Sequence, residues 1–207
     1  LIDVRRAGKT NPDDVRTDAL GRIIDEVGKA GNQAGVREEV RSLLVAGAET
    51  TSNTLGFLLL MLATRPDARD RLERELDAAP GGSPPFLDAV IFETLRLFPA
   101  VWFQTRESTT PIELGNHQLE KDDLVFVSTA LIHRRPDIWA DPDSFRPERF
   151  LPGSEDPQRS RHRYAFFPFG GGRHLCLGRH LALHELRLAV RGIFERFRVE
   201  VVDEIPL

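Results

Sequence analysis

The feature that most constrains the fold is a long apolar tract, SLLVAGAETTSNTLGFLLLMLAT, at residues 42–64. A segment of this length and composition has to be buried, either in a protein core or in a membrane. It contains Glu49, Asn53 and several threonines, and a carboxylate is costly at the middle of a bilayer. We therefore predict a buried core helix at residues 36–63 and no membrane segment in this chain.

Composition and charge indicate an ordinary soluble globular protein. Hydrophobic residues make up 41% and charged residues 29%, as in typical folded domains. The formal net charge of −4 gives no reason to expect a nucleic-acid partner. A single cysteine cannot form an internal disulfide, which favours a reducing, cytoplasmic location. Because residue 1 is leucine and Met61 is the only methionine, we expect the chain to be part of a longer protein.

The remaining sequence predicts a mainly α fold with a small antiparallel β region. Apolar residues recur at helical spacing in several segments, short alternating stretches indicate strands, and prolines without a period indicate an irregular meander. The predicted elements are helices at 13–30, 66–79, 86–98 and 177–197, a small sheet at 100–132, a meander at 134–165 and a final strand at 198–202.

The only cysteine, Cys176, lies in the glycine-rich segment FPFGGGRHLCLGRH at residues 167–180. Three consecutive glycines permit turns that direct backbone N–H groups inward. The predicted helix that follows presents its positive N-terminal dipole near the sulfur. Residues 157–184 contain five arginines, four histidines and no acid. Together these features favour the thiolate form of Cys176.

Four interpretations of Cys176 remain open from the residues alone. It could be a buried small hydrophobe, a nucleophile paired with a histidine, or a metal ligand with His180 and His184, which are spaced i,i+4. It could also be a thiolate ligand of haem iron. In that case the flanking glycines allow a flat macrocycle to approach, Phe169 covers the sulfur, and His174 is placed for the propionates.

The segment FGGGRHLCLG at residues 169–178 resembles the cysteine-ligand loop of the cytochrome P450 haem-thiolate monooxygenases. Its matching positions are Phe169, Gly170, Gly172, His174, Cys176 and Gly178. Three further segments match in family order, namely AGAETT at 46–51, ETLR at 93–96 and FRPERF at 145–150. The resemblance covers essentially the whole chain, which is similar to the C-terminal half of the family and closest in character to its soluble bacterial branch.

The resemblance implies a role for each matching residue. Cys176 would be the axial ligand of haem b iron, and Glu49 and Thr50 would be catalytic, with Thr50 bonding the activated oxygen and Glu49 relaying protons. Glu93, Arg96 and Arg149 would form a structural triad beneath the cysteine loop. The implied cofactor-binding residues are Ala46, Gly47, Arg106, Phe169, Gly172, His174, Cys176 and Gly178. His133 resembles a family His-Arg segment, and we expect no ligand contact for it.

The implied activity is insertion of one atom of dioxygen into an apolar small molecule, with Val101, Trp102 and Phe103 lining the pocket. Electrons would come from NAD(P)H through a ferredoxin or flavodoxin-type donor docked on the basic stretch 157–184. The acid–threonine pair favours oxygen activation over peroxide use or isomerisation. The alternative is a truncated, non-catalytic remnant, because an N-terminal half is absent from the P450 fold predicted here. We expect helices 36–63 and 86–98 to expose apolar surface and haem to bind weakly.

Overall fold

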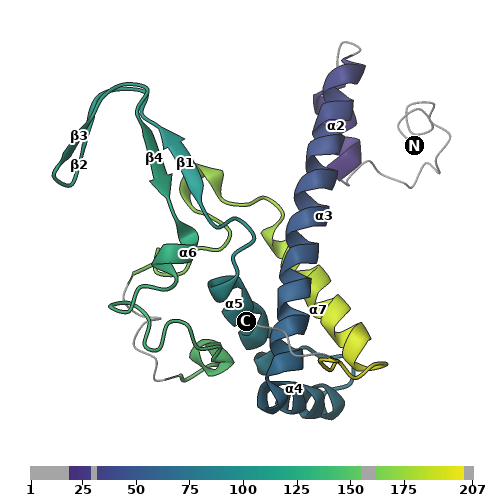
Figure 1. Ribbon diagram of the computed structural model, residues 1–207. Coiled ribbons are helices and arrows are strands. Elements are labelled where there is room, and N and C mark those ends of the chain that lie inside the picture. The colour runs from purple at the N-terminus through teal and green to yellow at the C-terminus, as the bar shows by residue number, and fades with distance from the viewer. Residues whose placement is uncertain (1–18, 29–31, 155–161, 203–207) are drawn as a thin grey trace. The chain divides into compact units, whose positions relative to one another are not determined.

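The computed structural model describes residues 19–28, 32–154 and 162–202, which are mainly helical (Figure 1). The longer helices are α2 (Ala19–Glu26), α3 (Gln33–Thr64), α4 (Pro66–Ala78), α5 (Pro85–Leu97) and α7 (Arg179–Phe194), with a short α6 (Thr129–Ile132). The mainly α fold with a small antiparallel region is confirmed. The chain divides into two compact units, Leu1–Glu49 and Thr50–Leu207, which are described in turn.

The first unit contains α2 and the first part of α3. Asn32 caps α3, because its Oδ1 accepts a hydrogen bond from the backbone N–H of Gly35 at 2.9 Å. A Cβ atom at Gly35 would lie 2.9 Å from the Val27 side chain, so the two helices approach closely there. Ile24 and Val36 are buried. Of the helix predicted at 13–30, residues 19–26 form α2, and 13–18, 29 and 30 lie outside the described residues.

Helix α3 runs without interruption through both units. Only 11% of its most apolar 18-residue window is buried. The prediction of a buried core helix at 36–63 is therefore wrong, whereas the expectation that this helix exposes apolar surface is confirmed. Leu58, Met61 and Leu62 are buried near its C-terminal end, whereas Leu44 is 67% exposed. Among the described residues, α3 is the one helix long and apolar enough to cross a membrane, a test that core helices of soluble proteins also pass.

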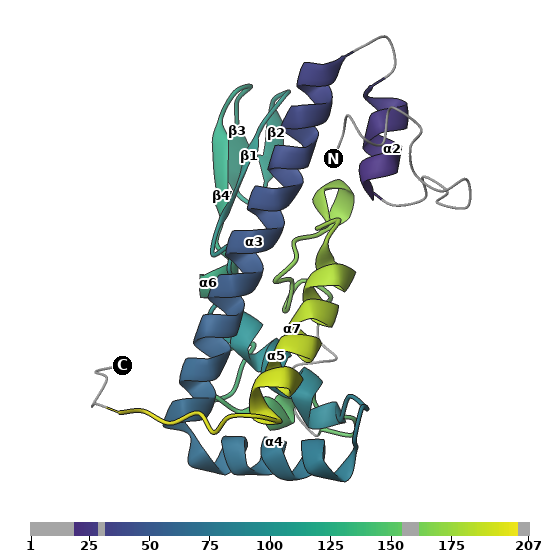
Figure 2. The ribbon, with the colours of Figure 1, turned by 90° about the vertical axis from the view of Figure 1, so that its right-hand side faces the viewer.

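The core of the second unit is built around α5. Figure 2 shows α7 beside α5, with α4 below both. The short 3₁₀ helix η2 (Pro147–Phe150) covers a further side of α5. The prediction that helix 86–98 exposes apolar surface is therefore wrong, because these three elements enclose it. The fully or almost fully buried apolar residues of α5 are Phe86, Leu87, Ala89, Val90, Ile91, Leu95 and Leu97.

The predicted sheet at 100–132 takes the form of two antiparallel pairs. Strand β1 (Gln104–Glu107) pairs with β4 (Leu124–Val127), and β2 (Ile112–Leu114) pairs with β3 (His117–Leu119). Gly115 has a φ of 61° in the turn between β2 and β3, a conformation that two-residue hairpin turns require. The β2–β3 hairpin projects from the end of the β1–β4 pair (Figure 1).

The C-terminal elements differ from the prediction at two points. Helix α7 begins at Arg179 and ends at Phe194 rather than spanning 177–197, because Gly178 is its N-cap and Glu195 its C-cap. The strand predicted at 198–202 is wrong, since this described segment has no strand assignment. Its Val199 carbonyl instead accepts a hydrogen bond from Nη1 of Arg69 at 3.3 Å, so a side chain takes the place of a β-ladder.

Candidate functional site

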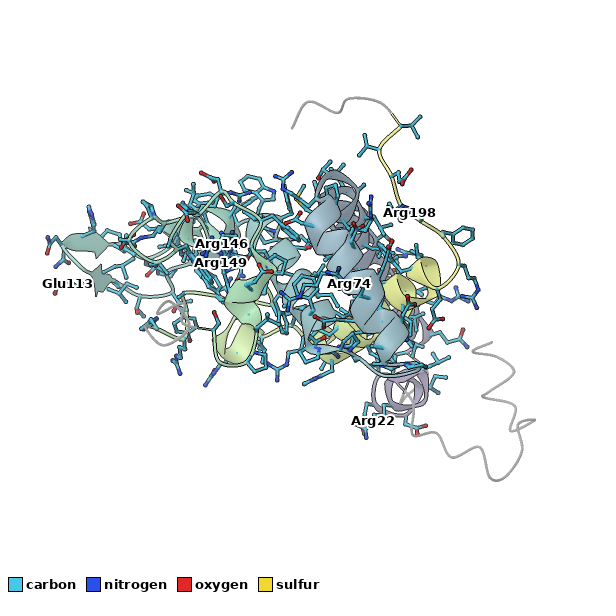
Figure 3. All side chains as sticks on the ribbon, turned by 90° about the horizontal axis from the view of Figure 1, so that it is seen from below. Arg22, Arg74, Glu113, Arg146, Arg149 and Arg198 are labelled. Carbon is cyan, nitrogen blue, oxygen red and sulfur yellow. The ribbon has the colours of Figure 1, made fainter. Side chains whose placement is uncertain are left out.

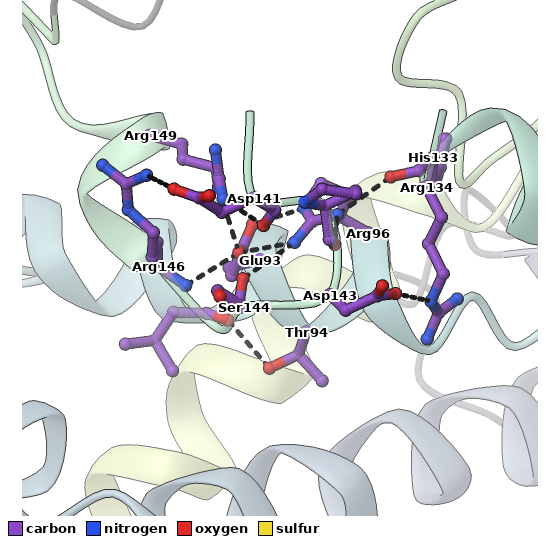
Figure 4. A network of polar contacts seen from close by, with 12 residues as sticks. Glu93, Thr94, Arg96, His133, Arg134, Asp141, Asp143, Ser144, Arg146 and Arg149 are labelled. Atoms are coloured by element: carbon purple, nitrogen blue, oxygen red, sulfur yellow. Dashed lines mark hydrogen bonds and ion pairs between the residues drawn. The ribbon is translucent and has the colours of Figure 1, made fainter. Parts of the chain in front are cut away.

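A buried polar network joins α5 to the segment that precedes η2 (Figure 4). Arg96 and Glu93, one helical turn apart, form a bidentate pair with two N–O distances of 2.8 Å. Both side chains are fully buried. The remaining Arg96 N–H groups donate to the carbonyls of His133 at 2.9 Å, Pro142 at 2.6 Å and Ser144 at 3.1 Å. A buried guanidinium is tolerated here because its donors are used.

The second arginine of the network comes from η2. Arg149, whose side chain is 1% exposed, lies 3.4 Å from Oε1 of Glu93 and donates to the Asp141 carbonyl at 2.8 Å. The backbone N–H of Arg146 donates to the same Glu93 oxygen at 2.8 Å. Figure 3 shows Arg146 and Arg149 together, far from Glu113 on the β2–β3 hairpin. The structure thus brings Glu93, Arg96 and Arg149 into one cluster.

The cysteine loop is held by backbone hydrogen bonds and leaves the side chain of Cys176 exposed. The Cys176 N–H donates to the Phe169 carbonyl at 2.9 Å, and the Gly170 N–H donates to the Phe167 carbonyl at 2.9 Å. Phe169 packs partly buried against the core, whereas Cys176 is exposed. Its exposure rules out the interpretation of Cys176 as a buried small hydrophobe.

Two glycines of the loop adopt backbone conformations that other residues rarely adopt. Gly170 has a φ of 72° and Gly172 a φ of 66°. A Cβ atom at Gly170 would lie 3.3 Å from both the Gln104 side chain and the His174 carbonyl. Gly178, the N-cap of α7, has a φ of −83°, and a Cβ atom there would meet nothing within 4 Å.

Strand β1 brings Arg106 to the neighbourhood of this loop through Gln104. Arg106 donates from Nη2 to Oε1 of Gln104 at 3.0 Å and from Nη1 to the Thr105 carbonyl at 2.7 Å. The Gln104 amide in turn lies against Gly170. Gln104 was not predicted from the sequence, and no spacing or motif would have indicated it.

The side chains around Cys176 carry positive charge and apolar surface. Arg173 and His174 are exposed on the 3₁₀ turn η4 (Gly172–His174). Leu177 is 90% and Leu181 60% exposed. Of the basic stretch 157–184, residues 157–161 lie outside the described residues. Among the described residues, no three His, Cys, Asp or Glu side chains could together hold a metal ion, so the site proposed with His180 and His184 lacks a full ligand set.

The AGAETT segment lies within α3 and remains α-helical. Ala46, Gly47 and Glu49 are exposed, and a Cβ atom at Gly47 would meet nothing within 4 Å. The Thr50 carbonyl accepts a hydrogen bond from Oγ1 of Thr54 at 2.9 Å. A threonine beside an acid can hydrogen-bond backbone carbonyls and so disturb the helical ladder. Helix α3 is nevertheless continuous through this segment. The hydrogen bond from the Thr54 hydroxyl to the Thr50 carbonyl does not interrupt it.

An apolar cleft of about 270 Å³ lies between the second half of α3 and the segment after α5. The rings of Phe57 and Phe98 stack at its wall, 4.5 Å apart. Of the three residues predicted to line a substrate pocket, Trp102 lines this cleft, whereas Val101 and Phe103 do not. The lining residues are Asn53, Phe57, Leu97, Phe98, Pro99, Ala100, Trp102 and Ala130.

The loop and its surroundings fit a haem group. The exposed thiol of Cys176 is of a kind that can ligate iron, and the exposed side chains of Arg106 and His174 are of a kind that can hydrogen-bond carboxylates. The open space above Gly178 leaves room for a flat molecule to approach the backbone. The exposed Leu177 offers apolar surface that such a molecule could cover.

Comparison with known proteins decides the family. The profile of the Cytochrome P450 family matches residues 9–206. The chain belongs to the cytochrome P450 family. It is 34% identical over its full length to cyclooctat-9-en-7-ol 5-monooxygenase of Streptomyces melanosporofaciens, of which it covers 46%. It is 33% identical over 88% of its length to cytochrome P450 4V2 of Mus musculus, of which it covers 36%.

A solved P450 structure has the same fold. A crystal structure of a cytochrome P450 (CYP102L1) matches 93% of this chain with a TM-score of 0.77 and 31% identity, and the match covers 46% of that structure. The chain thus spans about half the length of the P450 relatives that it matches, and it corresponds to their C-terminal part. The fold described above is therefore part of a P450 fold.

Proposed function

We propose that the chain forms part of a haem-thiolate monooxygenase in which Cys176 is the axial ligand of haem b iron. The observation that carries this proposal is the geometry of the cysteine loop. Its backbone is held by the Cys176–Phe169 and Gly170–Phe167 hydrogen bonds, while the thiol stays exposed. A ligand must be accessible and yet fixed in place, and this loop meets both requirements.

The residues around the thiol would bind the rest of the cofactor. Arg106 and His174 would hydrogen-bond the two haem carboxylates, as charged or polar donors do. Once bound, the haem supplies the electron-transfer and oxygen chemistry that no amino-acid side chain provides. Residues proposed to lie against its faces are Ala46, Gly47, Phe169, Gly172 and Gly178.

Glu49 and Thr50 would manage protons at the reacting centre. They are consecutive on α3, and Glu49 is exposed, so its carboxylate can exchange protons with water. A threonine hydroxyl both donates and accepts hydrogen bonds, which suits Thr50 to pass a proton onward. This pair supports oxygen activation rather than peroxide use or isomerisation.

The proposed substrate is an apolar small molecule, in keeping with the apolar lining of the cleft beside Phe57 and Trp102. Electrons would come from NAD(P)H through a ferredoxin or flavodoxin-type protein. Its acidic surface would meet cationic residues such as Arg163, which is exposed, and Arg179. We place the protein in the cytoplasm, and we expect this chain to contribute no membrane segment and to bind no nucleic acid.

The decisive experiment is the carbon-monoxide difference spectrum of the reduced, haem-reconstituted 207-residue chain. Thiolate ligation gives a strongly red-shifted Soret band, which Cys176→Ala should abolish. His184→Gln, a change on the exposed face of α7, is the matched control and should retain the band. A red-shifted band that survives in Cys176→Ala would refute the assignment of the ligand.

The competing proposal is a non-catalytic remnant. What supports it is that the chain covers only 46% of its Streptomyces relative, so part of a P450 haem pocket would have to come from elsewhere. This proposal predicts that the wild-type chain takes up haem weakly and gives no red-shifted band. Tight, stoichiometric haem binding with such a band would exclude it.

A further inference from the structure

His133 connects the buried network to the segment that leads into the cysteine loop. It follows α6 directly and is fully buried. Its backbone N–H donates to the Thr129 carbonyl at 2.9 Å, and its own carbonyl accepts from Nη1 of Arg96 at 2.9 Å (Figure 4). The backbone of His133 is therefore fixed to the same guanidinium that pairs with Glu93.

The imidazole of His133 bonds to the other segment. Its Nε2 accepts a hydrogen bond from the backbone N–H of Phe167 at 3.0 Å. The ring also packs against Phe166 and Phe167, with centroid distances of 5.2 and 5.4 Å. An accepting ring nitrogen carries no proton, so the proton of the neutral ring is on Nδ1. A donating imidazolium could not accept this hydrogen bond.

Burial keeps the ring in the accepting state. Desolvation, with smaller contributions from the charges of Arg96 and Arg134, lowers the pKa of His133 to about 4. The ring is consequently neutral at physiological pH. It therefore serves as an acceptor for the partly buried Phe167 N–H, a group that is costly to leave without one.

From Phe167, further backbone hydrogen bonds lead to the cysteine. The Phe167 carbonyl accepts from Gly170 at 2.9 Å, and two residues later the Phe169 carbonyl accepts from Cys176 at 2.9 Å. At Phe167 the loop is thus tied to the protein interior by a side chain. The tie runs through one ring nitrogen of His133.

We propose that His133 is a positioning residue, whose Nε2 fixes the start of the cysteine loop against the Glu93–Arg96 pair and thereby sets the location of the Cys176 thiol. This rests on the proposed function of Cys176 as the haem ligand. The relevant feature is an acceptor at the Nε2 position, not a histidine ring as such. A side chain that places an oxygen there should replace it.

The test compares His133→Gln, whose Oε1 can take the place of Nε2, with His133→Leu, which fills space without an acceptor. Hydrogen exchange of backbone amides is measured in the 207-residue chain without haem. We expect exchange at Phe167 and Cys176 to accelerate about ten-fold in His133→Leu, the effect of one lost hydrogen bond, and to return toward wild type in His133→Gln. Amides of the β1–β4 pair serve as the internal control.

Three results would overturn the proposal. They are unchanged exchange at Phe167 in His133→Leu, equal exchange in the Leu and Gln variants, and acceleration of the β1–β4 amides to the same extent. If His133→Leu does not fold, His133→Asn replaces it, since its shorter side chain cannot reach the Nε2 position.

The spectrum of the haem-loaded chain separates this proposal from the proposed function. If wild type shows the thiolate band, His133→Leu should lose a larger share of it than His133→Gln, and equal losses would contradict the proposal. If wild type shows no thiolate band, the proposed function fails. The exchange data still decide whether His133 fixes the loop.

Discussion

The buried network on α5 and the cysteine loop lie in the same compact unit but differ in how far the chain encloses them. The side chains of Glu93, Arg96 and Arg149 are 0–1% exposed, and backbone carbonyls satisfy the outer N–H groups of Arg96. Around Cys176 the backbone is bonded in the same way, yet the side chains point into open space. The network is therefore self-contained, whereas the loop presents a surface that another molecule can cover.

The largest effect is expected from removal of Arg96, the central cation of the buried network. Arg96→Leu leaves the Glu93 carboxylate buried with Arg149 and the Arg146 N–H as its remaining partners. We expect a loss of about 3–5 kcal/mol in the free energy of unfolding, measured by urea denaturation. Arg146→Gln is the control, because its exposed pair with Asp141 should contribute less than about 1 kcal/mol. Similar losses in the free energy of unfolding in both variants would show that the buried network stabilises the chain no more than the exposed pair does.

The pH dependence of stability tests the environment of His133, whose carbonyl is bonded to Arg96 of the network. Its pKa is lowered from 6.5 to about 4 in the folded chain, so between these values the unfolded chain binds more protons. The free energy of unfolding should therefore fall as the pH drops from 6.5 to 4, by about 3 kcal/mol from this residue. His133→Gln should lack this component when urea curves at pH 7 and pH 4 are compared. An identical pH dependence in both proteins would contradict the assignment.

Substitution by alanine should have different effects on stability at Gly170 and Gly178, two glycines that lie on either side of Cys176. Gly170→Ala forces a side chain into a left-handed conformation and toward Gln104, which we expect to destabilise the chain by about 1–2 kcal/mol. Gly178→Ala, at an ordinary φ with open space above it, should change unfolding by less than about 0.5 kcal/mol. Haem affinity, followed by Soret titration, should nevertheless fall in Gly178→Ala. Unchanged affinity would argue against a cofactor lying over this residue.

We expect the smallest effect on stability at Cys176, the residue proposed to ligate the haem iron. Because Cys176 is exposed, Cys176→Ser should alter the free energy of unfolding by less than about 0.5 kcal/mol. The same change should remove the red-shifted carbon-monoxide band entirely. A large destabilisation in the chain without haem would contradict the observed exposure of the thiol.

The family, the order of the motifs and most helices could be predicted from the sequence, since each depends on local residue types and spacing. The pairing of Glu93 with Arg96 is of this kind, because residues at i,i+3 share a helix face. The contacts of Arg96 with the carbonyls of His133, Pro142 and Ser144 could not be predicted, because they join segments that are far apart in the sequence and share no local pattern.

The errors have the same origin. Helix 86–98 was expected to expose apolar surface because an N-terminal half was taken to be absent, and no local pattern shows that α4, α7 and η2 enclose α5. The segment at 198–202 has strand-like residues, but a strand also needs a partner, and Arg69 supplies a different one. The links of Gln104 to Gly170 and of His133 to Phe167 are single long-range side-chain contacts. Only the folded chain brings such residues together.

The exposure of Cys176, combined with its being the only cysteine in the sequence, has a practical consequence. A maleimide fluorophore or a spin label can be attached at one defined position without engineering the chain. A cofactor bound at the sulfur would block labelling. The fraction of labelled protein would therefore equal the fraction of chains without bound cofactor. The same thiol can also cross-link two chains in air, and purification should therefore include a reductant.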